Sequence, residues 1–482
     1  MVKKGELLSS LFSIHQISDK IKKGDISPVD LVDVCLNRIQ KLNPLLNSFI
    51  TIVDEQQIYK QAENSEKEIK QGNYLGPLHG IPFSIKDMFY AKGIRFTAGS
   101  KIFTNYISQV NSTSVKKMRK AGAILMGSNN LNEFASGITG KNPFYGDSKN
   151  PWDRERISGG SSGGSAVAVA TGMALVSLGT DTGGSIRVPS SLCGVVGLKP
   201  TYNLISKNNV FPLSPSLDHI GCITKSAWDA AIVLKCLCKK NSLNKTYENK
   251  KNSAFVRVEN LKNKKKIVLG VPENYFFDFI DYDVEHIFHN FVKSLYFYKI
   301  NVETIKLHKT DKYYSSWRSI RLAEATEIHQ RRRLNSREGD YSNEVKNMLV
   351  EGTKISAIEY IQAMHIIKEI REEFLSLFRY KIDAIIVPTT VIPAPKLNED
   401  SVIVNKDFLI NIREALLRNT IVFNSIGLPA VSIPLGFTKI GGMPVGLQII
   451  GPPFGDNLVL SIGYYFECIN DKIFKSVLSI AN

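Results

Sequence analysis

The sequence predicts an α/β protein, and three observations lead to this prediction. Thr113–Lys120 has the composition of a short basic helix and runs directly into 121–127 (AGAILMG), a continuous apolar run typical of a buried strand. The small residues of 166–174 predict a helix packed closely against a sheet. The apolar residues of 175–179 predict the next buried strand. Helices that alternate with buried strands in this way favour an α/β architecture.

The segments on either side extend this pattern. Residues 11–70 have helical periodicity, and Ser27 followed by Pro28 predicts the N-cap and first turn of a helix over 29–42. The region 284–380 is mostly helical and charged. Further strands are predicted at 264–271, 382–387, 432–436 and 445–450. We find no internal repeat and no long linker. We therefore expect one domain over 1–482, with an N-terminal helical segment (1–75), a core at about 76–235 and a helical excursion at about 280–380.

Composition and charge limit the classes of function. Apolar residues make up 43% of the chain and charged residues 22%, which is ordinary for a soluble globular protein. The net charge of +16 raises the question of an acidic partner such as tRNA, and basic residues concentrate at 239–266. Its two aromatic residues, Tyr247 and Phe255, do not interleave the basic residues as a single-strand binding surface would require. A solvated connection is therefore favoured over a nucleic-acid patch.

The N-terminus and the cysteines indicate the compartment. The first residues contain no apolar signal segment, and the longest weakly polar run, 166–179, is too short to span a bilayer. The six cysteines are sparse and form neither a disulfide framework nor a zinc-binding pattern. We therefore expect a cytoplasmic protein that needs no metal and no cofactor.

A predicted strand and two loops rich in Gly and Ser carry the candidate chemistry. The strand 81–86 alternates apolar and polar side chains and ends at Lys86. The first loop, 159–163 (GGSSG), formally matches the GxSxG elbow of α/β-hydrolases, but a polar segment rather than a strand precedes it. None of the eight histidines lies in a distinctive setting for the base that such an elbow needs. A phosphate-binding loop is also excluded because no GK[ST] follows.

The second loop, 181–185 (DTGGS), follows a buried strand. Its glycines allow several consecutive backbone N–H groups to point at one spot, as an oxyanion requires, and Ser185 at its end is placed to attack a carbonyl group. A plain tight turn with a capping serine explains the same residues equally well. From local sequence alone, both interpretations stay open.

Several long motifs, taken together, resemble the amidase signature family. They are 80–87 (GIPFSIKD), 159–166 (GGSSGGSA), 179–187 (GTDTGGSIR) and 193–200 (CGVVGLKP). The similarity continues in 129–135 (NNLNEFA), 150–153 (NPWD), 427–434 (GLPAVSIP) and 444–451 (PVGLQIIG). It covers essentially the full length. The resemblance implies the amidase signature fold, with one large mixed β-sheet core flanked by helices on both faces.

The resemblance also implies a mechanism. Ser185 would be the nucleophile that forms an acyl-enzyme, and Lys86 would be a buried, largely unprotonated base. Ser161, held by a cis peptide bond after Gly160, would relay the proton between them. The remaining implied roles are oxyanion donors at the backbone N–H groups of Thr182, Gly183, Gly184 and Ser185, and loop support from Ser162, Asp181 and Arg187. Cys193 is an alternative nucleophile, but its apolar run and lack of a basic partner favour a buried core residue.

The family divides into stand-alone amidases and the glutaminase A subunit of the glutamyl-tRNA(Gln)/aspartyl-tRNA(Asn) amidotransferase. In the A subunits an Asp seven residues before the Asn of N-x-x-G-[LI]-P grips the amino group of glutamine; the corresponding residue here is Leu417. The segments 324–330 (EATEIHQ) and 356–363 (SAIEYIQA) also resemble the stand-alone enzymes. We therefore expect a general amidase that hydrolyses a small-molecule carboxamide to a carboxylic acid and ammonia. The alternative is the tRNA-dependent glutaminase of the amidotransferase.

A third alternative is a catalytically inactive binding subunit, which the intact triad positions disfavour. In this family the acyl pocket is built largely from regions such as 280–380 and 389–420, where sequence does not position side chains. We expect no membrane association, and no nucleic-acid partner unless the chain belongs to the amidotransferase. We leave a homodimer open, because dimers are common among relatives.

Overall fold

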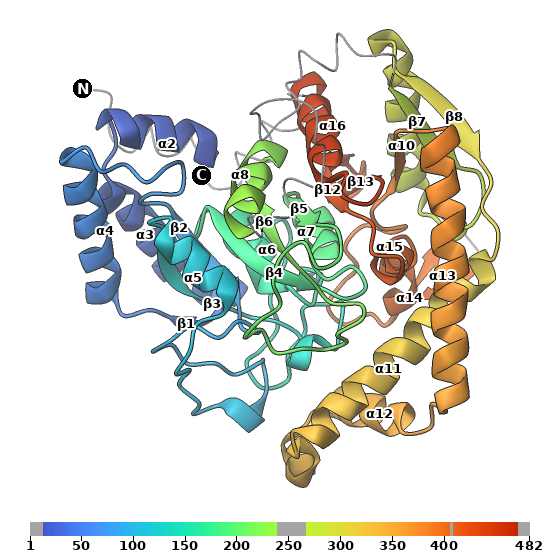
Figure 1. The fold of residues 1–482 in the computed structure, drawn as a ribbon, viewed down its shortest axis with the longest axis horizontal. Coiled ribbons are helices and arrows are strands. Elements are labelled where there is room, and N and C mark those ends of the chain that lie inside the picture. The colour runs from blue at the N-terminus through green and yellow to red at the C-terminus, as the bar shows by residue number, and fades with distance from the viewer. Residues whose placement is uncertain (1–12, 239–266, 405–407, 471–482) are drawn as a thin grey trace.

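A computed structural model describes residues 13–238, 267–404 and 408–470 of the chain (Figure 1). Its centre is one 11-stranded sheet with the strand order β1-β3-β2-β4-β6-β5-β12-β13-β9-β7-β8. Its strands are β1 (Phe49–Ile52), β2 (Pro82–Lys86), β3 (Ile124–Asn129), β4 (Val176–Asp181), β5 (Val196–Lys199), β6 (His219–Thr224), β7 (Val268–Pro272), β8 (Asn301–Ile305), β9 (Ala384–Pro388), β12 (Ala430–Phe437) and β13 (Pro444–Ile450). A separate hairpin pairs β10 (Ser401–Val404) with β11 (Phe408–Asn411).

The sheet is mixed, as expected from the sequence. Strand β2 runs parallel to β3 and β4, and β7 runs parallel to β8 and β9. The other neighbours in the sheet pair in antiparallel fashion. Because β2 and β4 are parallel neighbours, their carboxyl ends meet at the same edge of the sheet. Lys86 ends β2 at this edge, and the loop that carries Ser185 follows β4 there.

Helices precede, connect and follow these strands. The longer ones are α2 (Ile14–Lys23), α3 (Pro28–Leu46), α4 (Glu55–Lys70), α5 (Thr113–Lys120), α6 (Gly163–Ala170), α7 (Arg187–Cys193), α8 (Ala227–Leu237), α10 (Tyr282–Ser294), α11 (Tyr313–Arg331), α12 (Asn343–Gly352), α13 (Ala357–Tyr380) and α16 (Asp456–Ile469). Two short helices, α14 (Ile412–Leu417) and α15 (Ile421–Ser425), lie between β11 and β12.

Apolar cores pack against both faces of the sheet. Successive side chains of a strand point to opposite faces, and in β9 Ala384 and Ile386 belong to one core whereas Ile385 and Val387 belong to the other. Helices α6, α8 and α16 contribute to the first core. Helices α7, α11, α13, α14 and α15 contribute to the second. This arrangement confirms the prediction of helices on both faces.

Most locally predicted elements are confirmed with small shifts in their bounds. Ser27 caps α3, because its Oγ accepts a hydrogen bond from the Val29 amide at 3.0 Å. The predicted small-residue helix is α6, in which all eight residues are buried. The expectation of helices throughout 11–70 was wrong at Phe49–Ile52, which forms β1 because it pairs with β3 at the sheet edge. Strand β8 was not predicted either, since its first four residues are exposed at the sheet edge and carry no alternating apolar pattern.

The helical excursion lies to one side of the sheet. Figure 1 shows α11 and α13, in yellow and orange, next to one another, and the two helices pack together. The basic cluster at 239–266 lies outside the described residues. Within the described ranges, no helix combines the length and the apolarity needed to cross a lipid bilayer.

Candidate active site

The ends of two strands and the start of one helix bring the predicted site residues together. In the register of β2 and β4, Ile85 pairs with Leu178, so Lys86 and Thr180 emerge at the same edge. Helix α6 begins at Gly163, which places Ser161 directly before its first turn. The loop between β4 and α7 carries Ser185.

Lys86 and Ser161 are in direct contact. The Lys86 Nζ atom donates hydrogen bonds to Ser161 Oγ at 2.7 Å and to Thr180 Oγ1 at 2.8 Å. The Gly160–Ser161 peptide bond is cis, in agreement with the expectation from the sequence. Both side chains are fully buried, so this contact is shielded from bulk water.

Burial changes the ionisation of Lys86. Removal from water lowers the pKa of the Lys86 amine to about 7, although the carboxylates of Asp181 and Asp218 act in the opposite direction. A substantial fraction of Lys86 is therefore neutral at physiological pH. A neutral amine at this position can accept a proton from the Ser161 hydroxyl.

Ser185 lies at the mouth of the site. Its carbonyl oxygen accepts a hydrogen bond from the Ser162 amide at 3.1 Å, which ties the two Gly/Ser-rich loops together. In the described part of the chain, no hydrogen bond joins the hydroxyl groups of Ser161 and Ser185. The structure thus brings two of the three predicted catalytic side chains into contact and places the third on the adjoining loop.

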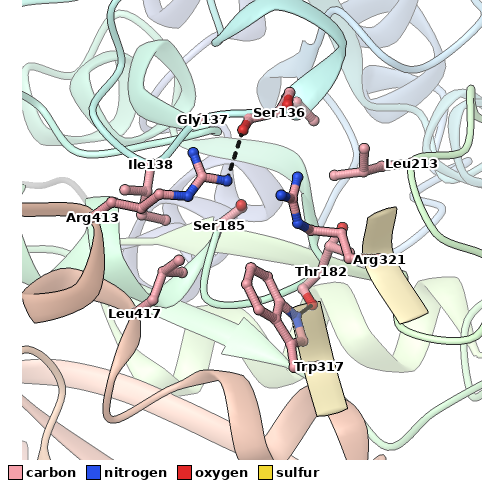
Figure 2. Close-up of a pocket in the computed structure, with 12 residues that line it drawn as sticks. Ser136, Gly137, Ile138, Thr182, Ser185, Leu213, Trp317, Arg321, Arg413 and Leu417 are labelled. Atoms are coloured by element: carbon pink, nitrogen blue, oxygen red, sulfur yellow. Dashed lines mark hydrogen bonds between the residues drawn. The ribbon is translucent and has the colours of Figure 1, made fainter. Parts of the chain in front are cut away.

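Ser185 also lines a pocket (Figure 2). The other lining residues are Ala135, Ser136, Gly137, Ile138, Thr182, Gly183, Leu213, Trp317, Arg321, Arg413 and Leu417. Ser185 therefore faces a cavity whose far walls come from the helical excursion and from α14. These walls lie within the regions 280–380 and 389–420, where the acyl pocket was expected.

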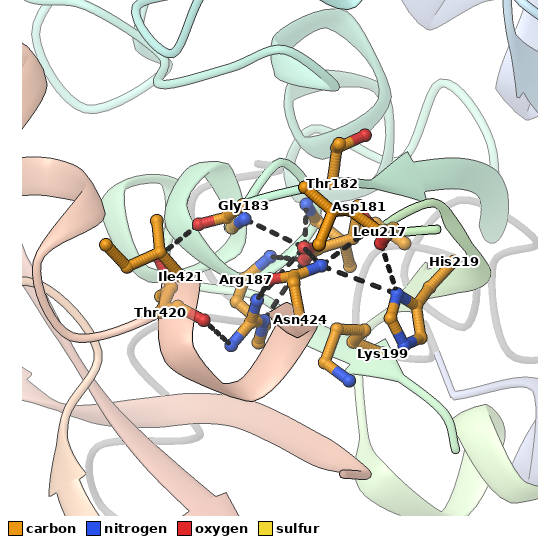
Figure 3. Close-up of polar contacts among 12 residues, drawn as sticks. Asp181, Thr182, Gly183, Arg187, Lys199, Leu217, His219, Thr420, Ile421 and Asn424 are labelled. Atoms are coloured by element: carbon orange, nitrogen blue, oxygen red, sulfur yellow. Dashed lines mark hydrogen bonds and ion pairs between the residues drawn. The ribbon is translucent and has the colours of Figure 1, made fainter. Parts of the chain in front are cut away.

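A buried ion pair holds the loop that carries Ser185 (Figure 3). Arg187 and Asp181 are both inaccessible to solvent, and the guanidinium binds the carboxylate through Nε to Oδ2 at 3.1 Å and through Nη2 to Oδ1 at 3.0 Å. Burial is the largest single influence and raises the pKa of Asp181. The charge and hydrogen bonds of Arg187, together with Lys199 and Asn424, outweigh burial and hold that pKa well below its usual range. The predicted supporting role of these two residues agrees with this geometry.

The ion pair is anchored to elements far along the chain. Arg187 Nη1 donates to Gln448 Oε1 at 2.6 Å on β13 and to the Thr420 carbonyl at 3.1 Å. Asn424 on α15 donates to Asp181 Oδ1 at 2.8 Å. The loop position therefore depends on the packing of α15 and β13 against it.

One predicted oxyanion donor has another partner. The Gly184 amide donates to Asp181 Oδ1 at 2.8 Å, so this N–H is not available to a substrate oxygen in this conformation. The reason is that the loop curls back over its own first residue. The amides of Thr182, Gly183 and Ser185 stay as the predicted donors.

The two glycines of this loop are required for different reasons. A Cβ on Gly183 would lie 2.7 Å from Trp317 Cζ2, whose indole nitrogen donates to the Thr182 carbonyl at 3.0 Å. Gly184 has φ +140°, a conformation that other residues rarely adopt, and a Cβ there would collide with Thr420 Oγ1. The loop can therefore approach α11 and α15 only because it carries no side chains at these two positions.

Two pocket arginines were not identified from the sequence. Arg321 lies on α11, four residues after the buried Trp317, and Arg413 lies on α14. The helical spacing of Trp317 and Arg321 is the one signal that could have placed both on the same face. Neither arginine belongs to a motif that resembles the family. By contrast, the predicted pocket residue Leu417 does line the cavity.

The described residues contain no group of three or more His, Cys, Asp or Glu side chains that could hold a metal ion. All six cysteines are free thiols. Burial raises the pKa of the Cys193 thiol far above its usual value, which disfavours its alternative role as a nucleophile.

Gly184→Ala should lower the free energy of unfolding by about 2 kcal/mol or more beyond the effect of Gly72→Ala, because it adds an overlap with Thr420 to the backbone strain. Gly72 is a matched control with φ +86° and open space around its Cβ position. Urea unfolding of both variants measures the difference. Equal losses would mean that the loop can move away from α15 without cost.

Comparison with known proteins relates the chain to one family. The model of the Amidase family matches residues 30–460. The A subunit of the glutamyl-tRNA(Gln) amidotransferase from Desulforamulus reducens is 34% identical, over 94% of this chain and 96% of the relative.

Two solved structures extend the comparison. A crystal structure described as an amidase has a TM-score of 0.85 at 32% identity and covers 95% of this chain and 99% of its own. The A subunit of the glutamyl-tRNA(Gln) amidotransferase from Thermotoga maritima has a TM-score of 0.74 at 33% identity, with 94% and 93% covered. The chain therefore belongs to the amidase family, which its sequence motifs resemble.

Proposed function

We propose that this chain hydrolyses a carboxamide to a carboxylic acid and ammonia through an acyl-enzyme on Ser185. The contact of Lys86 Nζ with Ser161 Oγ at 2.7 Å, on a lysine whose pKa burial lowers to about 7, carries the proposal. A buried lysine beside a serine hydroxyl has little structural purpose, because it must lose its charge or find an anion. As a proton acceptor, the buried lysine has a chemical purpose.

The first half-reaction forms the acyl-enzyme. Neutral Lys86 accepts the proton of Ser161, whose oxygen accepts the proton of Ser185 as the Ser185 oxygen bonds to the carbonyl carbon of the amide. The carbonyl oxygen becomes an anion, which the amides of Thr182, Gly183 and Ser185 stabilise. A small movement of the Ser185 side chain toward Ser161 is needed to complete this relay.

Departure of ammonia completes the acyl-enzyme, because the proton returns from Lys86 through Ser161 to the amide nitrogen and the C–N bond then breaks. In the second half-reaction water loses a proton to Lys86 along the same route and attacks the ester carbonyl. The proton then passes from Lys86 through Ser161 to the Ser185 oxygen, which leaves as the carboxylic acid is released. Asp181 and Arg187 hold the loop in place without exchanging protons.

The comparisons favour a role for this chemistry in the glutamyl-tRNA(Gln) amidotransferase. The curated relatives of 32–34% identity carry the name of its A subunit, and they match over nearly the full length. They reverse the order expected from the sequence, in which the stand-alone amidase came first. In this role the chain would act with partner subunits that receive the ammonia, and glutamine would be the amide.

One observation keeps the stand-alone amidase as a second candidate. Glutamine carries an ammonium group, and Leu417 occupies the position where the A subunits are expected to have an aspartate for it. Leu417 lines the pocket, and no residue that lines this pocket is acidic. A substrate without an ammonium group therefore fits these walls better than glutamine does.

Ser185→Ala should lower kcat by a factor on the order of 10⁴ or more, and Ser161→Ala and Lys86→Ala should each cause large losses. The losses should be far from additive in double variants, because the three residues act on one proton. Single-turnover kinetics on purified variants measures this. If Lys86→Ala kept near wild-type rates, the proton relay would be wrong.

The value of kcat/KM should rise with pH up to about 7 and level off above it. The lowered pKa of Lys86 determines where this rise ends, because only the neutral amine accepts a proton. The neutral fraction of Lys86 increases as the pH passes that pKa. A pH–rate profile from about pH 5.5 to 9, with circular dichroism at each pH to control for unfolding, provides the test. A rate that falls as pH passes 7 would contradict the role of Lys86 as base.

Ammonia release from butyramide, benzamide and L-glutamine separates the two roles, with Ser185→Ala as the blank. The amidotransferase role predicts that glutamine is the preferred donor and that partner subunits and tRNA stimulate the reaction. The stand-alone amidase predicts turnover of simple amides by the purified chain. Inactivity toward every amide with and without partners would contradict both roles and favour a binding subunit that is catalytically inactive.

A further inference from the structure

Arg321 is a buried cation without an anionic partner. Its side chain comes from the middle of α11 and the residue is only 6% exposed. Its Nε atom has no hydrogen-bond partner in the described part of the chain. Its Nη1 atom contacts the thioether sulfur of Met348 at 3.1 Å, which is a weak acceptor. A buried guanidinium in such surroundings costs stability unless another group binds it.

Other arginines of the same helix are paired. Arg318 binds Glu351 at 2.7 Å, and Arg331 binds Glu327 at 2.6 Å. These two arginines are exposed, where an ion pair contributes little. Carboxylates of α11 and α12 thus pair with exposed arginines, whereas the buried Arg321 has no ion-pair partner among the described residues.

Arg321 stays charged at neutral pH, although its surroundings do not neutralise that charge. Its guanidinium lies 5.2 Å from the centre of the Trp317 ring, within the range of a cation–π contact. Burial, and next the nearby charge of Arg413, lower the pKa of Arg321 to about 9. The side chain is therefore still a cation at neutral pH.

Arg321 faces the same space as the reactive serine. Figure 2 shows the guanidinium groups of Arg321 and Arg413 directed toward the cavity beside Ser185. Arg413 is already engaged, because it donates to the Ser136 carbonyl at 3.1 Å and to Glu344 Oε1 at 3.1 Å. Arg321 is thus the pocket cation with free hydrogen-bonding capacity.

The remaining walls limit what the pocket can accept. Leu213, Ile138, Trp317 and Leu417 are apolar, and no lining residue is acidic. A carboxylate on the substrate would meet two guanidinium groups. A substrate ammonium would meet the same two cations and no counter-ion, which costs affinity.

We propose that Arg321 is the counter-ion for a carboxylate on the acyl part of the substrate, and that this substrate is the monoamide of a short dicarboxylic acid without an amino group. This inference rests on the proposed amide hydrolysis at Ser185, takes up the second candidate function, the stand-alone amidase, and adds the class of amide. The planar guanidinium can bind both oxygens of the carboxylate and so orient the amide carbonyl toward Ser185.

Three amides of similar length test the charge requirement. They are glutaramate, which carries a carboxylate; L-glutamine, which carries a carboxylate and an ammonium; and butyramide, which carries neither. We expect kcat/KM for glutaramate to exceed that for butyramide by about 100-fold or more. We expect glutamine to fall below glutaramate. A preference for glutamine over glutaramate, or equal rates with glutaramate and butyramide, would overturn the proposal.

Variants assign the effect to one side chain. Arg321→Gln should remove the preference for glutaramate, chiefly through KM, and leave butyramide hydrolysis within a few-fold of wild type. Arg321→Lys should restore part of the preference. Arg318→Gln is the matched control, since Arg318 lies on the same helix and pairs with Glu351 outside the pocket, and it should change neither rate. Equal losses with both substrates in Arg321→Gln would mean that Arg321 serves only the structure.

A binding measurement separates this inference from the proposed reaction. Calorimetry of glutaramate with Ser185→Ala should show binding that Arg321→Gln weakens by about 100-fold. If binding depends on Arg321 but no amide is turned over by the wild type, the carboxylate site stands and the proposed hydrolysis fails. If hydrolysis of butyramide proceeds and glutaramate does not bind, the hydrolysis stands and the carboxylate site fails. Unfolding of Arg321→Gln is checked by its melting temperature, which should not fall, because the change removes an unpaired buried charge.

Discussion

The buried ion pair of Asp181 and Arg187 is the interaction on which the geometry of the site depends. Two charges removed from water are tolerated only when nearly all of their hydrogen-bonding groups are satisfied. Here the side-chain amide of Asn424 and the Gly184 N–H donate further hydrogen bonds to the Asp181 carboxylate. The Gln448 side chain and the Thr420 carbonyl accept hydrogen bonds from the Arg187 guanidinium. The pair therefore joins β4, α7, α15 and β13 at the loop that presents Ser185. Movement of that loop would leave a charge buried and unpaired.

The same ion pair bears on the proposed base. Asp181 tends to raise the pKa of Lys86, which would keep the amine charged and unable to accept a proton. Burial outweighs this effect and lowers the pKa of Lys86 to about 7. The carboxylate that holds the loop is thus also a group whose charge opposes the neutral form of the proposed base.

The parts of this site that could be predicted from the sequence are those built from contiguous segments. The strand ending at Lys86, the loop before α6 and the loop after β4 each contain their residues within a few positions, and their order in the chain matches their neighbourhood in the sheet. The contact of Lys86 with Ser161 follows from such motifs. The hydrogen bond from the Gly184 amide to Asp181 could not be predicted from such motifs, because it depends on how the loop folds back on Asp181.

Pocket residues from distant helices could not be predicted in the same way. Arg321 and Arg413 reach the cavity because α11 and α14 pack against the β4–α7 loop, and sequence periodicity does not specify which part of the sheet a helix will cover. Leu417 could be placed because the Asn424 motif gives it a fixed offset. The exposed edge strand β8 was missed for a related reason, since pairing with β7 alone, without burial, gives its residues no apolar pattern.

Reaction and selectivity therefore have separate origins in this fold. The groups proposed to move protons and stabilise the oxyanion lie on the sheet edge, in the segments that the family shares. The groups proposed to contact the acyl part of the substrate lie on α11 and α14, outside those segments. Similarity over the whole chain identifies the reaction more securely than the substrate. The unpaired cation of Arg321 is the kind of local cost that a fold retains where a ligand relieves it. In this protein that charge is the basis of the proposed substrate class, whereas the names of the relatives favour glutamine.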